Sequence, residues 1–136
     1  MKRVIKFRAW DSDFGSMVYE FTEDGYSVDM QNGNLVAGSI DGNGDYFEME
    51  LMQFTGLTDK SGKEIYVGDI LSALWKVEVF QNDEGTFMVK FHTNPSGNRP
   101  LSLKKYLKYR EQAGTREEDN TIIGNIYENP ELIQTK

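Results

Sequence analysis

The sequence predicts a mainly β fold, a β-rich α+β class, in which an N-terminal region of strands precedes a compact C-terminal β unit with a short helical insertion. Three observations support this prediction. Glycine is abundant and proline is rare, 13 against 3, as in folds with many tight turns. Segments in which apolar and polar residues alternate recur along the chain, as in half-buried strands. Helical spacing is confined to residues 101–112.

Length and composition limit the number of domains, the chemistry and the localisation that the chain can have. A chain of 136 residues suits one compact unit or two subdomains, an acidic one at 1–55 and a second at 56–136. Hydrophobic residues make up 38% of the chain, enough for a packed core. Cysteine is absent, which excludes disulfides and thiolate chemistry. Charged residues interrupt the apolar stretch that a signal peptide would need near the start of the chain. No apolar run approaches the ~20 residues of a membrane span. We therefore expect a cytoplasmic protein without membrane contact.

The charge is unevenly distributed. The net charge is −7, which argues against a general affinity for nucleic acid or anionic membranes. Between residues 11 and 50 the chain carries ten acidic residues and no Lys or Arg. This acidity can serve solubility, or it can form a docking face for a basic partner. In the second case it can act as a polyanion mimic that occupies a basic site on a host protein.

The N-terminal half contains five predicted strands. In the first, Lys2–Ala9, Lys6 and Arg8 lie on the polar side, and a turn leads to a hairpin partner. The strongest alternation places Phe47, Met49 and Leu51 on one face and Glu48 and Glu50 on the other. The other predicted strands are Met17–Phe21, Tyr26–Met30 and Leu35–Ile40, and the last is Tyr46–Phe54.

The C-terminal half is predicted as a meander of strands, a common basis of small barrels. A polar loop around Asp59–Lys63 joins two β-prone segments, and a turn is expected at Gly68-Asp69. A helix is predicted over Leu101–Gln112 with Ser102 as a cap, and Asn129 is predicted to cap a short turn that begins at Pro130. The predicted strands are Asp69–Trp75, Lys76–Gln81, Thr86–His92 and the closing strand Thr121–Tyr127.

One glycine-rich loop, Asp41–Asp45, resembles a calcium loop because oxygen ligands alternate along it. It departs from the EF-hand pattern at the sixth position, Tyr46, and at the twelfth, Met52. We expect a structural turn here and no metal site.

No set of catalytic residues can be assembled from the sequence. His92 is the only histidine, so metal sites with two histidines are excluded, and phosphate-binding glycine loops are missing. Glu48 and Glu50 form a carboxylate pair, but such pairs on strands usually face solvent. We therefore expect no enzyme activity, no catalytic or metal-binding residues and no cofactor.

One basic patch stands out, formed by Arg99, Lys104, Lys105, Lys108 and Arg110 in and before the predicted helix. A solvated helix face and a contact with phosphate or nucleic acid both fit this pattern.

Three segments carry a family resemblance: Lys6–Asp11, Met52–Ile70 and Ile123–Leu132. Together, and in this order, they are similar to the YopX family of small phage and prophage proteins. The resemblance implies a phage or prophage origin and a C-terminal part similar to an SH3-like barrel. It implies no established activity and no catalytic residue.

The motif residues of these segments have a structural interpretation. Glycines suit tight turns or close backbone approach, Asp69 can accept backbone hydrogen bonds, and the aromatic residues Trp10, Phe54, Tyr66 and Tyr127 can seal the junction of the two halves. The expected structural set is Gly56, Gly62, Tyr66, Gly68, Asp69, Gly124, Asn125 and Tyr127. The expected function is a non-enzymatic interaction or regulatory module that binds a protein partner or its own copies.

Overall fold

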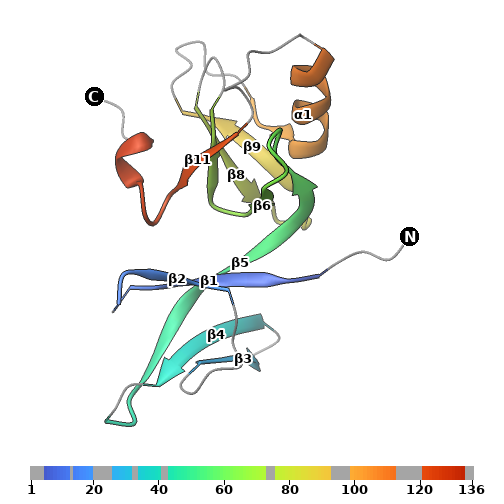
Figure 1. Ribbon diagram of the computed structural model, residues 1–136. Coiled ribbons are helices and arrows are strands. Elements are labelled where there is room, and N and C mark those ends of the chain that lie inside the picture. The colour runs from blue at the N-terminus through green and yellow to red at the C-terminus, as the bar shows by residue number, and fades with distance from the viewer. Residues whose placement is uncertain are drawn as a thin grey trace. The chain divides into compact units, whose positions relative to one another are not determined.

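The computed structural model describes residues 5–12, 14–19, 26–31, 34–40, 43–72, 76–92, 99–112 and 121–133. Within these ranges the protein is rich in strands, with two antiparallel sheets and little helix (Figure 1). The strands of the first half are β1 (Phe7–Asp11), β2 (Ser16–Val18), β3 (Tyr26–Gln31), β4 (Asn34–Ile40) and β5 (Tyr46–Thr58). Those of the second half are β6 (Glu64–Tyr66), β7 (Asp69–Leu71), β8 (Val77–Gln81), β9 (Phe87–Phe91), β10 (Leu101–Ser102) and β11 (Ile122–Asn125). The helices are α1 (Leu103–Gln112) and the 3₁₀ turn η1 (Pro130–Leu132).

The chain divides into two compact units. The N-terminal unit comprises Ile5–Gln53, and the C-terminal unit comprises Met1–Val4 together with Phe54–Lys136. The division falls inside β5, which contributes to both units.

The N-terminal unit is an antiparallel sheet with the strand order β2-β1-β5-β4-β3. Its core is small: Ala9, Ala37 and Met49 are buried, and three half-buried residues, Val18, Val28 and Leu51, pack against them. The strand register explains this cluster, because Ala9 lies between Val18 and Leu51, and Ala37 lies opposite Met49. The hairpin of β1 and β2 is confirmed.

Arg8 contradicts the prediction that the polar side of the first strand faces solvent. Its side chain is only 3% exposed, and it lies opposite Met52, which is equally buried. Alternation divides a strand into two faces, but it does not determine whether the polar face is also covered.

β5 is longer than predicted. The alternation ends at Phe54, whereas the strand continues through Gly56 to Thr58. Gly56 has a φ of 84°, and the register against β6 shifts between Phe54 and Thr58. Gly56 therefore lies at an irregularity inside β5, where the positive φ suits glycine. It does not lie in a loop after the strand.

The C-terminal unit contains a sheet with the order β10-β9-β8-β7-β11. The predicted meander is confirmed for β7, β8 and β9, and β11 returns to pair with β7. The described strands form an open sheet and not a closed barrel, so the SH3-like barrel stays a prediction. The turn predicted at Gly68-Asp69 is confirmed between β6 and β7.

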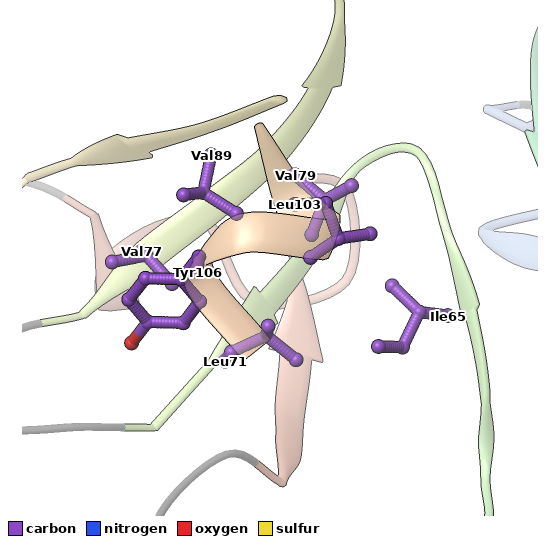
Figure 2. Close-up of a cluster of buried hydrophobic side chains, with 7 residues drawn as sticks. All are labelled: Ile65, Leu71, Val77, Val79, Val89, Leu103 and Tyr106. Carbon is purple, nitrogen blue, oxygen red and sulfur yellow. The ribbon is translucent and has the colours of Figure 1, made fainter. Parts of the chain in front are cut away.

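The main core lies between this sheet and α1. Ile65, Leu71, Val77, Val79 and Val89 are completely buried, as is Leu103 of α1, and Tyr106 is 3% exposed. Figure 2 shows Leu103 and Tyr106 directed toward the valines of β8 and β9. The Tyr106 ring also meets Phe91 edge-on, with 6.0 Å between the ring centroids. These contacts fix the helix on one face of the sheet.

The two predicted caps have different outcomes. Ser102 is confirmed, because its Oγ accepts a hydrogen bond from the Lys105 N–H at 3.1 Å. Asn129 is not a side-chain cap of η1. Its Oδ1 instead accepts a hydrogen bond from the Asn125 N–H at 3.2 Å, because the preceding turn brings that amide closer than the amides of η1.

Candidate functional site

The loop after β5 is organised by one carboxylate, Asp59, which is 5% exposed. Its Oδ1 accepts hydrogen bonds from the Ser61 N–H, the Ser61 hydroxyl and the Lys63 N–H at 2.9, 2.7 and 2.9 Å. Its Oδ2 accepts a hydrogen bond from the Ile122 N–H at 2.9 Å. Asp59 therefore closes its own loop and ties that loop to the start of β11.

These hydrogen bonds determine the ionisation of Asp59. Burial alone raises the pKa of this carboxyl, but the hydrogen bonds from Ile122, Ser61 and Lys63 outweigh burial and hold the pKa below its ordinary value. The charged form is therefore the stable one in the fold. A carboxylate held in this way suits a structural anchor better than a proton-transfer group.

A second junction is centred on Gly68-Asp69. The Asp69 Oδ2 accepts a hydrogen bond from the Tyr66 N–H at 2.8 Å and is 1% exposed. Gly68, with a φ of 95°, donates its N–H to the Val79 carbonyl and accepts a hydrogen bond from the Ile126 N–H. The turn thus connects β8 with the segment after β11.

A third junction follows β11. The Asn125 Oδ1 accepts hydrogen bonds from the Tyr127 and Glu128 N–H groups at 3.0 and 2.8 Å, and its Nδ2 donates to Glu128 Oε1. A Cβ on Gly124 would lie 2.7 Å from the Asn129 Cγ, so a larger residue fits at this position only if the Asn129 side chain moves.

The structural set expected from the sequence is therefore brought together in part. The rings of Tyr66 and Phe54 pack against each other within the C-terminal unit, with centroids 5.5 Å apart and planes tilted by 43°. Gly62 lies in the Asp59 loop with a φ of 91°, where its N–H donates to the Asp59 carbonyl. Tyr127 lies in the Asn125 turn, where its N–H donates to the Asn125 Oδ1. The polar groups of this set bind backbone amides, which is a structural role.

The sequence did not predict one charged cluster. It consists of Glu78 on β8, Lys90 on β9 and His92 just after β9. His92 Nε2 and Glu78 Oε1 are 2.8 Å apart, and the Lys90 Nζ lies 3.7 Å from the same oxygen. Glu78 is 7% exposed, although it lies on the sheet face opposite Val77 and Val79. The signal was available, because the alternation of the two strands placed all three residues on one hairpin face.

This Glu78 cluster orients the only histidine of the chain by a buried carboxylate. Such a pair can position an imidazole as a base or a ligand. A reaction would require a nucleophile or a third ligand. Within the described part of the chain, no three His, Cys, Asp or Glu residues gather as metal ligands would. Across the two strands Glu78 contacts both Lys90 and His92, and the Lys90 Nζ also lies 5.5 Å from the centre of the Phe80 ring.

The expected basic patch lies on and before α1. Arg99, Lys104, Lys105 and Lys108 are exposed, whereas the side chain of Arg110 lies outside the described part. Of the Asp41–Asp45 loop, Asn43, Gly44 and Asp45 are described and exposed, and Gly44 has a φ of 82°. Residues 41 and 42 lie outside the described residues. No helix in the described chain is long and apolar enough to cross a membrane.

Comparison with known proteins agrees with the motifs. The family model described as YopX protein matches residues 6–134. Among solved structures, the chain is similar to the crystal structure of protein EF1440 from Enterococcus faecalis, with a TM-score of 0.57 and 26% sequence identity over 98% of this chain and 100% of that one. No curated protein matches significantly. The chain belongs to the YopX protein family.

Proposed function

We propose that this protein is a non-enzymatic interaction module that binds a basic protein partner through its N-terminal unit. The observation that carries the proposal is the distribution of exposed apolar side chains. Of the eight large hydrophobic residues exposed in the described chain, six belong to the unit Ile5–Gln53. They are Ile5, Phe14, Tyr19, Met30, Ile40 and Phe47.

The small core of this unit supports the proposal. Among the described residues of this unit four apolar ones are buried, Ala9, Ala37, Met49 and Met52, and two of them are alanines, whereas seven larger residues form the main core cluster of the C-terminal unit. A sheet that buries so little apolar surface gains stability from whatever covers it. Exposed Phe14 and Met30, at 76% and 65%, are the side chains with most area to lose to a partner.

Charge indicates what kind of partner fits. Asp45, Glu48 and Glu50 are exposed, and the chain has no Lys or Arg between Ala9 and Asp59. A partner with basic residues among apolar ones is complementary to this surface. The same complementarity suits a polyanion mimic directed at a basic site of a host protein.

The edge of the sheet offers a mode of binding. Among the described strands, β3 pairs only with β4, so its outer side presents backbone groups to an added strand. Such a strand can come from a protein partner or from a second copy of the chain. The arrangement of β7 to β11 is also compatible with an SH3-like unit, and the family resemblance favours a phage or prophage protein that acts in the bacterial cytoplasm.

The experiment is partner capture from host cells with charge-reversed variants. The double variant E48K/E50K alters the acidic face, and D83K/E84K makes the same charge change at an exposed turn of the C-terminal unit. We expect a partner that is retained by the wild type and by D83K/E84K and lost by E48K/E50K. Equal retention by all three proteins, or no partner together with a strictly monomeric mass in light scattering, would contradict the proposal.

A further inference from the structure

The strongest unassigned feature is the exposed surface of α1, formed by Arg99, Lys104, Lys105 and Lys108 and called the α1 basic surface below. None of these four side chains takes part in an ion pair within the described part of the chain. The contrast with Lys90, which lies close to Glu78, is clear. Within the described residues, four cations of an acidic protein thus lie on and just before α1 without an ion-pair partner.

The orientation of these cations is fixed by the core. Leu103 and Tyr106 are buried against the sheet, and α1 lies beside β9 (Figures 1 and 2). The helical period then places Lys104, Lys105 and Lys108 on the opposite side, where all three are exposed. The helix cannot rotate to bury them without losing Leu103 from the core.

The start of the helix adds to the positive potential. Its first turn contains no acidic residue, and Ser102 caps it through the Lys105 N–H. The partial positive charge of a helix N-terminus therefore adds to the ammonium groups, and the first turn contributes no carboxylate that would offset it.

We infer that the α1 basic surface binds the phosphate backbone of double-stranded DNA without regard to sequence. The exposed residues of α1 whose side chains are described are all lysines, a residue type that is depleted at protein–protein interfaces but common at phosphates. Tyr106, the aromatic side chain of α1 that the structure describes, is buried and cannot stack on a base, which favours duplex over single-stranded nucleic acid. This inference concerns a different unit from the proposed partner site and does not depend on it.

The number of cations on the α1 basic surface determines how strongly DNA binding should depend on salt. Neutralising about three or four phosphates gives a slope of log K against log salt of roughly −3. Binding should therefore weaken roughly 40- to 150-fold between about 50 and 200 mM salt. The negative charge of the rest of the protein opposes approach, so the binding is detectable mainly at low salt.

The test is fluorescence anisotropy with a labelled duplex of about 20 base pairs over a salt series. The variants are K104E/K108E and, as a control with the same charge change, K60E/K63E at two exposed lysines of the Asp59 loop. We expect K104E/K108E to weaken binding at least about 10-fold more than K60E/K63E does and to flatten the salt slope by about two. Circular dichroism checks that both variants are folded.

Three outcomes would overturn the inference. The first is no binding of the duplex at low salt. The second is equal weakening by K104E/K108E and K60E/K63E, which would indicate net charge and not the α1 basic surface. The third is binding of polyglutamate as tight as binding of DNA, which would assign the surface to an acidic protein. The variant E48K/E50K distinguishes DNA binding from the partner binding proposed above. It alters the acidic face of the N-terminal unit and leaves the α1 basic surface intact.

Discussion

Replacing Asp59 by asparagine tests whether this carboxylate holds the C-terminal unit together. Asparagine keeps one oxygen, which can still accept the hydrogen bonds of the loop from Ser61 and Lys63. Its amide group then occupies the position of Oδ2, which accepts a hydrogen bond from the Ile122 N–H at 2.9 Å. Two donors would face each other, and the link between residues 59 and 122 would be lost.

The magnitude follows from that link. A hydrogen bond to a charged group contributes about 1.5–3 kcal/mol, and a partly buried N–H without an acceptor adds to the loss. We therefore expect Asp59→Asn to lower the free energy of unfolding by about 2–4 kcal/mol at neutral pH. This expected loss applies where Asp59 is ionised, because the charged carboxylate is the form that accepts these hydrogen bonds.

The stabilising contribution of Asp59 depends on pH, and the direction of its pKa shift decides whether the contribution is lost at low or at high pH. The pKa of Asp59 is lower in the fold than its ordinary value of 3.8, because hydrogen bonds from Ile122, Ser61 and Lys63 outweigh burial, which raises it. The unfolded chain therefore binds a proton more readily. The stabilising contribution is fully present above 3.8 and is lost as the pH falls through the folded pKa. The stability difference between wild type and Asp59→Asn should shrink below about pH 4.

The assay is urea unfolding monitored by circular dichroism at neutral and acidic pH, combined with amide hydrogen exchange at Ile122. Asp83→Asn, at an exposed turn, is the matched control and should change stability by less than about 0.5 kcal/mol. Equal urea midpoints for wild type and Asp59→Asn, or an Ile122 amide that keeps its protection, would refute the reasoning.

Three further predictions concern packing and the Glu78 cluster. Gly124→Ala should destabilise by about 1–3 kcal/mol because the new Cβ meets Asn129, and calorimetry should find a smaller penalty in an Asn129→Ala background. Leu103→Ala should cost about 2–5 kcal/mol in urea unfolding, against less than about 0.5 for exposed Lys104→Ala; equal effects would contradict the packing of α1. Glu78→Gln should shift the NMR resonances of the His92 ring, and an unchanged His92 spectrum would show that the 2.8 Å contact is absent in solution.

Much of the fold follows from local patterns in the sequence. The alternation of Lys76–Gln81 and Thr86–His92 predicted neighbouring strands of a meander, and the register of Val79 opposite Val89 confirms them. Ser102 was recognisable as a cap because its hydroxyl acts on an amide three residues away. Such features depend on neighbours in the chain, so they can be read without knowledge of the tertiary structure.

Other predictions failed because the backbone conformation decides which of several possible partners a residue meets. Asn129 has the composition of a helix cap, but its side chain binds the Asn125 amide, which a turn brings near. The alternation predicted a strand that ends at Phe54, yet β5 continues through Gly56 to Thr58 because β6 pairs on both sides of the irregularity. Local propensity could not decide between these alternatives.

Periodicity, turn residues and motifs are local properties, so the class of the fold, the meander, the capped helix, the acidic N-terminal half and membership of the YopX family could all be predicted from them. That Asp59 binds the Ile122 amide, 63 positions along the chain, and that Glu78 contacts His92 became evident in the folded protein. The folded protein also shows that Arg8 is buried. Hydrogen bonds, ion pairs and burial depend on which residues the fold brings together, and one chain offers many such pairings before it folds.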